Sequence, residues 1–224
     1  MFHKTRTVRM LVIVTVLILL LVIIRILYHY NYIPHRKYKG EDFGISPYIS
    51  AVDADGDGID DQSDILQSAK EYVATKPKYK SQYYQTGYPD DEFGVCTDVV
   101  AFALKNSGYD LMNLVNEDII HHPEDYAIEE PDKNIDFRRV VNLQVYFSHT
   151  AEALTTDPTD IKQWQGGDIV IWEHHVGIIS DTRNKKGIPF VLHNGSVMQA
   201  SYEQDILETW GEIKGHYRIN GRLR

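Results

Sequence analysis

The sequence predicts an α+β protein in which a helix packs on an antiparallel sheet, preceded by one transmembrane helix. Three observations support this: an apolar run near the N-terminus, apolar residues at helical spacing after Cys96, and three strand-like segments between residues 167 and 194. A chain of 224 residues is long enough for one domain and a small addition such as an anchor. The predicted divisions are an N-terminus at 1–9, a transmembrane helix at 10–29, a stalk at 30–52, an acidic loop at 53–64 and a folded domain at 65–224.

Charge is divided unevenly along the chain. Residues 1–40 hold seven of the 23 Lys and Arg residues and no Asp or Glu, so the rest carries 16 bases against 32 acids. An acidic domain of this kind repels phosphate backbones, so nucleic acid is not an expected partner. The single cysteine, Cys96, leaves no disulfide framework.

The first thirty residues predict a membrane anchor. Every residue from Met10 to Ile24 is apolar except Thr15, and the run continues to about residue 29. Roughly 20 residues of helix span a hydrocarbon core of about 30 Å. Basic residues at positions 4, 6 and 9 favour a cytoplasmic N-terminus, with the long following domain outside the cell. A cleaved signal peptide is the alternative, but no small-x-small site follows the run, so we expect a single-pass protein of the cell membrane.

Two polar segments follow the anchor. Residues 30–52 are rich in tyrosine and interrupted by proline and glycine, which is typical of a stalk. The next twelve residues have the spacing of a calcium-binding loop, with a turn-forming glycine at position 6. The predicted Ca²⁺ ligands, of which Ile59 acts through its carbonyl, are Asp53, Asp55, Asp57, Ile59, Asp61 and Asp64. Asp64 replaces the usual glutamate, and the alternative is an acidic linker that caps the next helix.

Cys96 is the predicted nucleophile. A polar, Tyr-rich loop ends at Gly94, and apolar residues then recur at helical spacing up to Gly108, so Cys96 opens a buried helix. The unpaired N–H groups of a helix start stabilise a thiolate or an oxyanion, so we expect a Cys96 pKa below the free value of about 8.5. The alternative is that this lone cysteine is a small buried core residue.

Two histidines are candidates to activate this thiol. Residues 167–172, 175–181 and 189–194 predict three strands joined by short turns, which places His175 at the start of the second and His193 at the end of the third. A cysteine nucleophile needs a base, and the base needs a group that orients it. Consecutive strands of an antiparallel meander lie side by side, so His175 and His193 are expected to be neighbours and suit the roles of base and orienting group. His174, adjacent to His175, leaves the choice of base open.

Motifs around these residues resemble known families. The order of Cys96, Gly167-Asp168-Ile169-Val170, His175-Val176-Gly177-Ile178 and His193 is similar to that of NlpC-type cell-wall cysteine peptidases. More closely, the chain resembles the bacterial domain of unknown function 1287 (DUF1287) from about residue 64 to 220. The motifs that carry this second resemblance lie at residues 94–100, 131–140, 142–143 and 215–218.

The resemblance implies a papain-like (NlpC-type) fold and a cysteine peptidase or amidase that cleaves amide or peptide bonds in peptidoglycan, with no cofactor for catalysis. It implies Cys96 as nucleophile, His175 as general base and His193 as the orienting residue. Tyr88 or Tyr84 would take the place of the tyrosine that lies upstream of the cysteine in those enzymes.

Some features leave alternatives open. The chain has Val-Cys-Thr-Asp at 95–98 where NlpC-type enzymes usually have Asp-Cys-Ser-Gly, so substrate preference does not transfer. Arg138 and Arg139 suit either substrate carboxylates or an internal ion pair. The histidines at 121 and 122 predict the polar end of a helix rather than a metal site, and the three tryptophans predict core packing. Competing functions are an inactive calcium-stabilised binding module and an acyltransferase that uses the same Cys–His pair.

Overall fold

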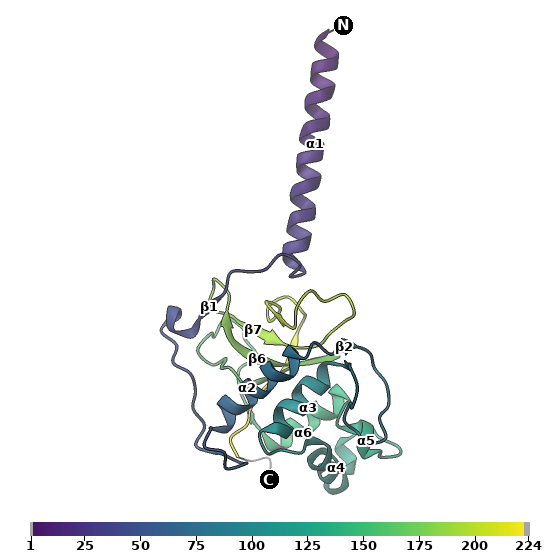
Figure 1. The fold of residues 1–224 in the computed structure, drawn as a ribbon, viewed down its shortest axis with the longest axis vertical. Coiled ribbons are helices and arrows are strands. Elements are labelled where there is room, and N and C mark those ends of the chain that lie inside the picture. Colours follow the sequence, from purple (N-terminus) through teal and green to yellow (C-terminus); the bar gives the residue numbers. More distant parts are fainter. Residues whose placement is uncertain (1, 222–224) are drawn as a thin grey trace.

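The computed structural model describes residues 2–221, with side chains from residue 8 onward. Its longest element is helix α1 (Phe2–His29), which stands away from the folded domain (Figure 1). Residues Val8–His29 are long and apolar enough to cross a membrane, with a mean hydropathy of 3.3. Thr15 donates its hydroxyl to the Leu11 carbonyl at 2.9 Å, so this polar group is satisfied within the helix. The predicted apolar helix is therefore present.

One antiparallel sheet forms the centre of the domain. Its strands follow the order β4-β9-β5-β6-β7-β8, and β1 pairs with β6 outside this path. The strands are β1 (Tyr38–Lys39), β4 (Glu152–Ala153), β5 (Ile169–Trp172), β6 (His175–Arg183), β7 (Pro189–Leu192), β8 (Glu203–Gln204) and β9 (Ile213–Arg218). Ile178 of β6 pairs with Ile169 of β5 on one side and with Leu192 of β7 on the other. The α+β class with an antiparallel sheet is therefore confirmed.

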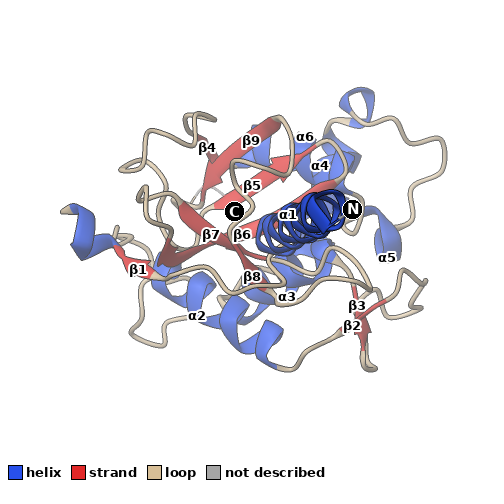
Figure 2. Cartoon of the chain, turned by 90° about the horizontal axis from the view of Figure 1, so that it is seen from above, coloured by secondary structure: helices blue, strands red, loops and turns tan. Residues whose placement is uncertain are grey.

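Helices cover one side of this sheet. They are α2 (Asp61–Ala74), α3 (Cys96–Asn106), α4 (Leu111–His121), α5 (Lys133–Asp136) and α6 (Val140–Thr150), with 3-10 turns η1 (Gly40–Phe43) and η2 (Pro123–Asp125). Viewed along α1, α2 and α3 lie along one side of the central strands (Figure 2). The other three helices gather at the end of the domain away from α1 (Figure 1). A separate parallel pair, β2 (Lys78–Tyr79) and β3 (Phe93–Gly94), lies in the loop before α3.

The core follows the alternation of side chains along the strands. Ile169 and Ile171 of β5 pack with Val100 of α3, whereas Val170 and Trp172 belong to a second cluster on the opposite face. All five side chains are at least 98% buried. Burying a side chain of this size stabilises the fold by about 1.5–3 kcal/mol. Because both faces of β5 are covered, its sequence is a continuous apolar run rather than an alternation of apolar and polar residues.

The segment predicted as a stalk packs on the domain instead. β1 extends the sheet by pairing Tyr38 with Arg183 of β6, and Ile45 is buried a few residues later. Ser50 is also buried, and its N–H donates to Asp60 at 2.8 Å. A two-residue strand carries no visible periodicity, so the sequence did not reveal this pairing.

The end of α1 is joined to the domain by specific hydrogen bonds. Tyr32 donates its hydroxyl to the Met198 carbonyl at 2.6 Å, and the Asp205 N–H donates to Asn31 Oδ1 at 3.0 Å. His35 Nδ1 lies 2.7 Å from the Asp205 carboxylate. The segment that follows α1 therefore packs against the domain.

Candidate active site

The candidate nucleophile lies in the first turn of α3. Val95 precedes the helix with extended backbone, and its N–H donates to the Asp98 carboxylate at 2.8 Å. This contact from the third helical residue helps to fix the helix start. Cys96, the first helical residue, is partly exposed. Its sulfur interacts with its own N–H and with those of Thr97 and Val176, so the thiol lies between the starts of α3 and β6.

A buried ion pair holds this helix start. Arg138 donates Nε to Asp98 Oδ1 at 2.6 Å and Nη2 to Oδ2 at 2.9 Å, and its Nη1 donates to the Gln82 carbonyl at 2.8 Å. Both side chains are almost fully buried. Of the two roles left open for Arg138, the structure therefore has the internal ion pair. Arg139 is half-exposed and lies 3.9 Å from Asp136.

The two candidate histidines form a hydrogen-bonded chain. His175 opens β6 and His193 directly follows β7, and their Nε2 and Nδ1 atoms are 3.1 Å apart. His193 Nε2 lies 2.9 Å from Gln204 Oε1. Because an amide oxygen only accepts, His193 carries its proton on Nε2 and accepts through Nδ1, which makes His175 Nε2 a donor. Nδ1 of His175 is then the unprotonated nitrogen that a general base requires.

Burial favours the neutral forms of the candidate nucleophile and of both histidines. Burial and, next, His193 lower the pKa of His175 well below its ordinary value, and burial lowers the pKa of His193 to about 4. Burial raises the pKa of the Cys96 thiol to about 11. The predicted depression of the Cys96 pKa is therefore wrong, because lost hydration and the Asp98 carboxylate outweigh the N–H groups around the sulfur.

Cys96 and His175 line the same cavity of about 460 Å³. Among the described residues no hydrogen bond joins the thiol to His175. Catalytic contacts of this kind are often long before a substrate binds. His174 lines the cavity too, but it is exposed and lies outside the histidine chain. The geometry thus favours His175 over His174 as the base.

Trp210 forms a wall of this cavity. Its ring stacks on His175 with 4.5 Å between centroids and meets His193 edge-on at 5.2 Å. It is 39% exposed, so its prediction as a core residue is wrong, whereas Trp164 and Trp172 are buried as predicted. Trp210 also lines an adjoining cavity together with tyrosines 30 and 32 at the end of α1.

Glycine is required beside the histidine pair. A Cβ on Gly195 would lie 2.9 Å from the Trp210 ring, 3.0 Å from His193 Nδ1 and 3.2 Å from His175 Cε1. The contact below 3.0 Å would force the Trp210 ring to move, and the two histidine rings would have to shift by a few tenths of an ångström. The close approach of this loop therefore depends on the absence of a side chain at residue 195.

The histidine side of the site is also tied to the cysteine side. Asn194, next to His193, donates Nδ2 to the carbonyls of Pro77 and Gly94 at 2.9 Å each. Gly94 lies two residues before Cys96, so this amide links the end of β7 to the approach to α3. Sequence reasoning did not single out Asn194, because its partners lie about a hundred residues away.

The predicted substrate tyrosines lie elsewhere. Tyr88 is buried and donates its hydroxyl to Asp110 at 2.9 Å, and Tyr84 donates to Asp91 at 2.8 Å. Neither lines the cavity that holds Cys96 and His175. Tyr79 lines that cavity and is 37% exposed, although its sequence neighbourhood gave no sign of this.

The acidic loop gathers several of its predicted calcium ligands. The carboxylates of Asp53, Asp55 and Asp57 each place an oxygen within 4.8 Å of the others. Burial raises the pKa of the Asp64 carboxyl, and the charges of Asp55 and Asp57 add to this rise. Three of the predicted ligands are thus close together.

Asp61 and Ile59 differ from this pattern. The Asp61 carboxylate accepts from the Ala54 N–H at 2.7 Å and from the Tyr109 hydroxyl. Asp61 is buried, so it serves as an internal acceptor rather than joining the cluster. The Ile59 N–H donates to Asp57 at 2.8 Å, which shapes the turn.

The fold and site define an α+β protein with an apolar N-terminal helix and a cysteine beside a buried histidine pair. The chain belongs to the family described as Domain of unknown function (DUF1287), which matches residues 66–219. The "Uncharacterized protein YijF" of Escherichia coli (strain K12) is 36% identical over 169 residues, covering 69% of this chain and 80% of that protein. No solved structure gave a significant match. The resemblance to DUF1287 is confirmed, and the NlpC-type relationship stays a prediction.

Proposed function

We propose that this protein is a membrane-anchored cysteine hydrolase of papain-like fold that cleaves amide or peptide bonds outside the cell, with peptidoglycan as its substrate. Cys96 is the nucleophile, His175 the general base and His193 the group that orients the base. The supporting observation is the chain from Gln204 through His193 to His175, which leaves an unprotonated nitrogen on a residue that lines the same cavity as the thiol.

In the proposed reaction the thiol loses its proton as it attacks, because both groups start neutral. Sγ of Cys96 bonds to the substrate carbonyl carbon while its proton passes to Nδ1 of His175. Backbone N–H groups at the start of α3 stabilise the oxyanion. His175 then protonates the leaving nitrogen, the C–N bond breaks, and the acyl group stays on sulfur. Water, deprotonated by His175, releases the acid and restores the thiol.

Location and substrate have separate support. α1 is long and apolar enough to span a bilayer, and the basic residues before it favour a cytoplasmic N-terminus. The nucleophile helix α3 packs against β6 of an antiparallel sheet, which supports the papain-like fold. The motif order of NlpC-type peptidases supports a cell-wall amide as the target.

The test is digestion of purified peptidoglycan by the detergent-solubilised full chain, with the fragments identified by mass spectrometry. Wild type should release fragments with new amino and carboxyl ends. Cys96→Ala should release none, and His175→Ala should lower the rate roughly 10²-fold or more. His174→Ala is the matched control and should stay within about twofold, because this neighbour lies outside the histidine chain.

Two results would contradict the proposal. Identical fragments from wild type and Cys96→Ala would show that the thiol does not catalyse cleavage. New amide bonds without new carboxyl ends would assign the acyl-enzyme to a transferase instead of a hydrolase.

We also propose that the acidic loop binds one structural Ca²⁺. Asp53, Asp55 and Asp57 bring together hard oxygen ligands, which suit this cation, and Asp64 is the fourth proposed ligand. Asp61 contributes indirectly, because its bonds to the Ala54 N–H and Tyr109 hold the loop against the domain.

A further inference from the structure

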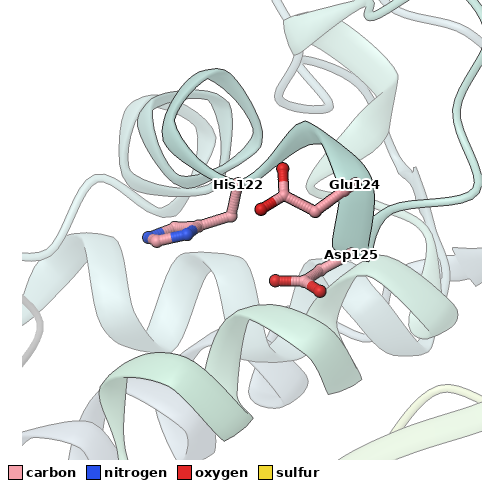
Figure 3. A group of neighbouring side chains, drawn as sticks. All are labelled: His122, Glu124 and Asp125. Carbon is pink, nitrogen blue, oxygen red and sulfur yellow. The ribbon is translucent and has the colours of Figure 1, made fainter.

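A second group of polar side chains lies at the end of the domain away from α1, where α4 and η2 meet α6. His122, Glu124 and Asp125 each place a ligand atom within 4.8 Å of the others. Figure 3 shows both carboxylates directed to the side on which the His122 ring lies. The tight η2 turn brings these residues together, because Pro123–Asp125 forms a single 3-10 turn directly after the end of α4.

His149, from the last turn of α6, lies beside this group. Its ring lies 5.1 Å from the His122 ring, and its Nε2 is 3.4 Å from Asp125 Oδ2. Its other nitrogen, Nδ1, is 2.7 Å from Asp118 Oδ2. A carboxylate only accepts, so the proton of neutral His149 lies on Nδ1 and points at Asp118.

Asp118 is itself held in place. Tyr126 donates its hydroxyl to the same carboxylate, and burial together with Asp118 raises the pKa of Tyr126. Asp118 therefore stays a fixed acceptor that sets the orientation of the His149 ring. A histidine whose Nδ1–H donates to a carboxylate presents Nε2 as a ligand, which is the usual arrangement around protein-bound zinc.

A positive charge between His149 and Asp125 would stabilise their contact. Nε2 of neutral His149 carries no proton and lies 3.4 Å from Asp125 Oδ2, so two acceptor atoms are close together. Either a proton on Nε2 or a cation between the two atoms removes this repulsion. Two ligands about 2.1 Å from a tetrahedral ion lie about 3.4 Å apart, so the observed separation fits a shared metal ion.

We propose that His122, Glu124, Asp125 and His149 bind one divalent transition-metal ion of the zinc class, with Asp118 as the positioning residue for His149. Two imidazoles and two carboxylates give the nitrogen and oxygen donors that Zn²⁺ prefers, whereas Ca²⁺ and Mg²⁺ prefer oxygen alone. The ion joins the turn after α4 to the end of α6. It is a structural link, independent of the proposed catalytic site.

The test uses the full chain in detergent, without a histidine tag and in a Cys96→Ser, His175→Ala, Asp55→Ala background. These changes remove the catalytic and acidic-loop groups that also attract metals. Zn²⁺ should bind with a stoichiometry of one by calorimetry, and Co²⁺ should give the visible absorption of a tetrahedral site. His122→Ala and His149→Ala should each weaken binding at least about tenfold, and Asp118→Asn roughly 10–100-fold.

His121→Ala is the matched control. His121 is the neighbour of His122, but its Nδ1 bonds to the Glu117 carbonyl at 2.8 Å, so its loss should leave the affinity unchanged. Absence of saturable Zn²⁺ binding, or binding that survives both His122→Ala and His149→Ala, would overturn the proposal and assign the 3.4 Å contact to a protonated His149. Because His122 is exposed, its variant stays informative even if His149→Ala fails to fold.

Discussion

Gln204 decides which nitrogen of His193 carries a proton, yet nothing in the local sequence marks it. It lies in a two-residue strand and reaches His193 only because β8 pairs with β7. Cys96 and the two histidines could be predicted, since each stands at the boundary of an element whose periodicity is visible. Gln204 and Trp210 could not, because tertiary packing alone brings them to the site.

The neutral pair predicts a particular pH dependence. Cys96 alkylation by iodoacetamide should keep rising above pH 9, because the thiol pKa is about 11. Hydrolysis should persist below pH 6.5, because a base with a lowered pKa stays unprotonated until the pH falls through that lowered value. Timed alkylation assays and peptidoglycan digestions, each run over a range of pH, measure the two pH profiles. An alkylation rate that reaches its plateau below pH 8.5 would show that Cys96 is a thiolate at neutral pH. The control variant His174→Ala should change neither pH profile.

At the scale of elements, the motif at 215–218 of the DUF1287 resemblance and the Gly167-Asp168 motif of the NlpC-type resemblance are both architectural. Asp168, just before β5, is fully buried and accepts from Arg218 at 2.8 Å and from Gln62 at 2.9 Å. His216 Nε2 lies 2.9 Å from the same carboxylate. This network joins β9, β5 and α2. Its residues were visible in the sequence as a pattern, but their role depends on strand order, which local spacing does not give.

The ion pair on α3 predicts a measurable coupling. Arg138→Met should cost about 3–5 kcal/mol of unfolding free energy, because it leaves the buried Asp98 carboxylate without its partner. The double variant Asp98→Asn, Arg138→Met should lose less than the sum of the single changes. Urea unfolding followed by tryptophan fluorescence measures each value. Additive losses would show that the two side chains do not depend on each other.

The acidic loop predicts a response to calcium. Millimolar Ca²⁺ should raise the melting temperature of the domain, because an ion that binds only the folded state stabilises it by mass action. Asp55→Ala should abolish the rise, and the exposed Glu129→Ala should retain it. Scanning calorimetry with calcium and with chelator provides the comparison. An unchanged wild-type melting temperature would return residues 53–64 to the class of acidic linkers.

For the molecule as a whole, the order of its parts could be predicted, but not their mutual placement. The apolar helix and the strands β5, β6 and β7 lie where periodicity predicted them. Segment 30–52 was predicted as a stalk because it lacks periodicity and is interrupted by proline and glycine. Its pairing with β6 and its bonds to Asp205 involve residues about 145 to 175 positions away, and such contacts leave no local signal.

The proposed topology is tested on whole cells. Protease added to intact cells stripped of their wall should digest the domain from about residue 40 onward, because the translocated part is exposed. A cytoplasmic protein in the same sample should stay intact, and detergent lysis should expose both. Immunoblotting against the domain follows the digestion. Complete protection of the domain would reverse the orientation.

The hydrogen bonds of residues 31, 32 and 35 hold the end of the apolar helix against the domain, so the connection between them is not a free linker. With α1 in a bilayer, these bonds would hold the cavity lined by Cys96 and His175 at a definite height above the lipid surface. The cavity shares Trp210 with the hollow beside Tyr30 and Tyr32, so that height is small. If the proposed hydrolase activity holds, substrate would then be met in a thin layer next to the membrane, through lateral diffusion of the protein in the bilayer.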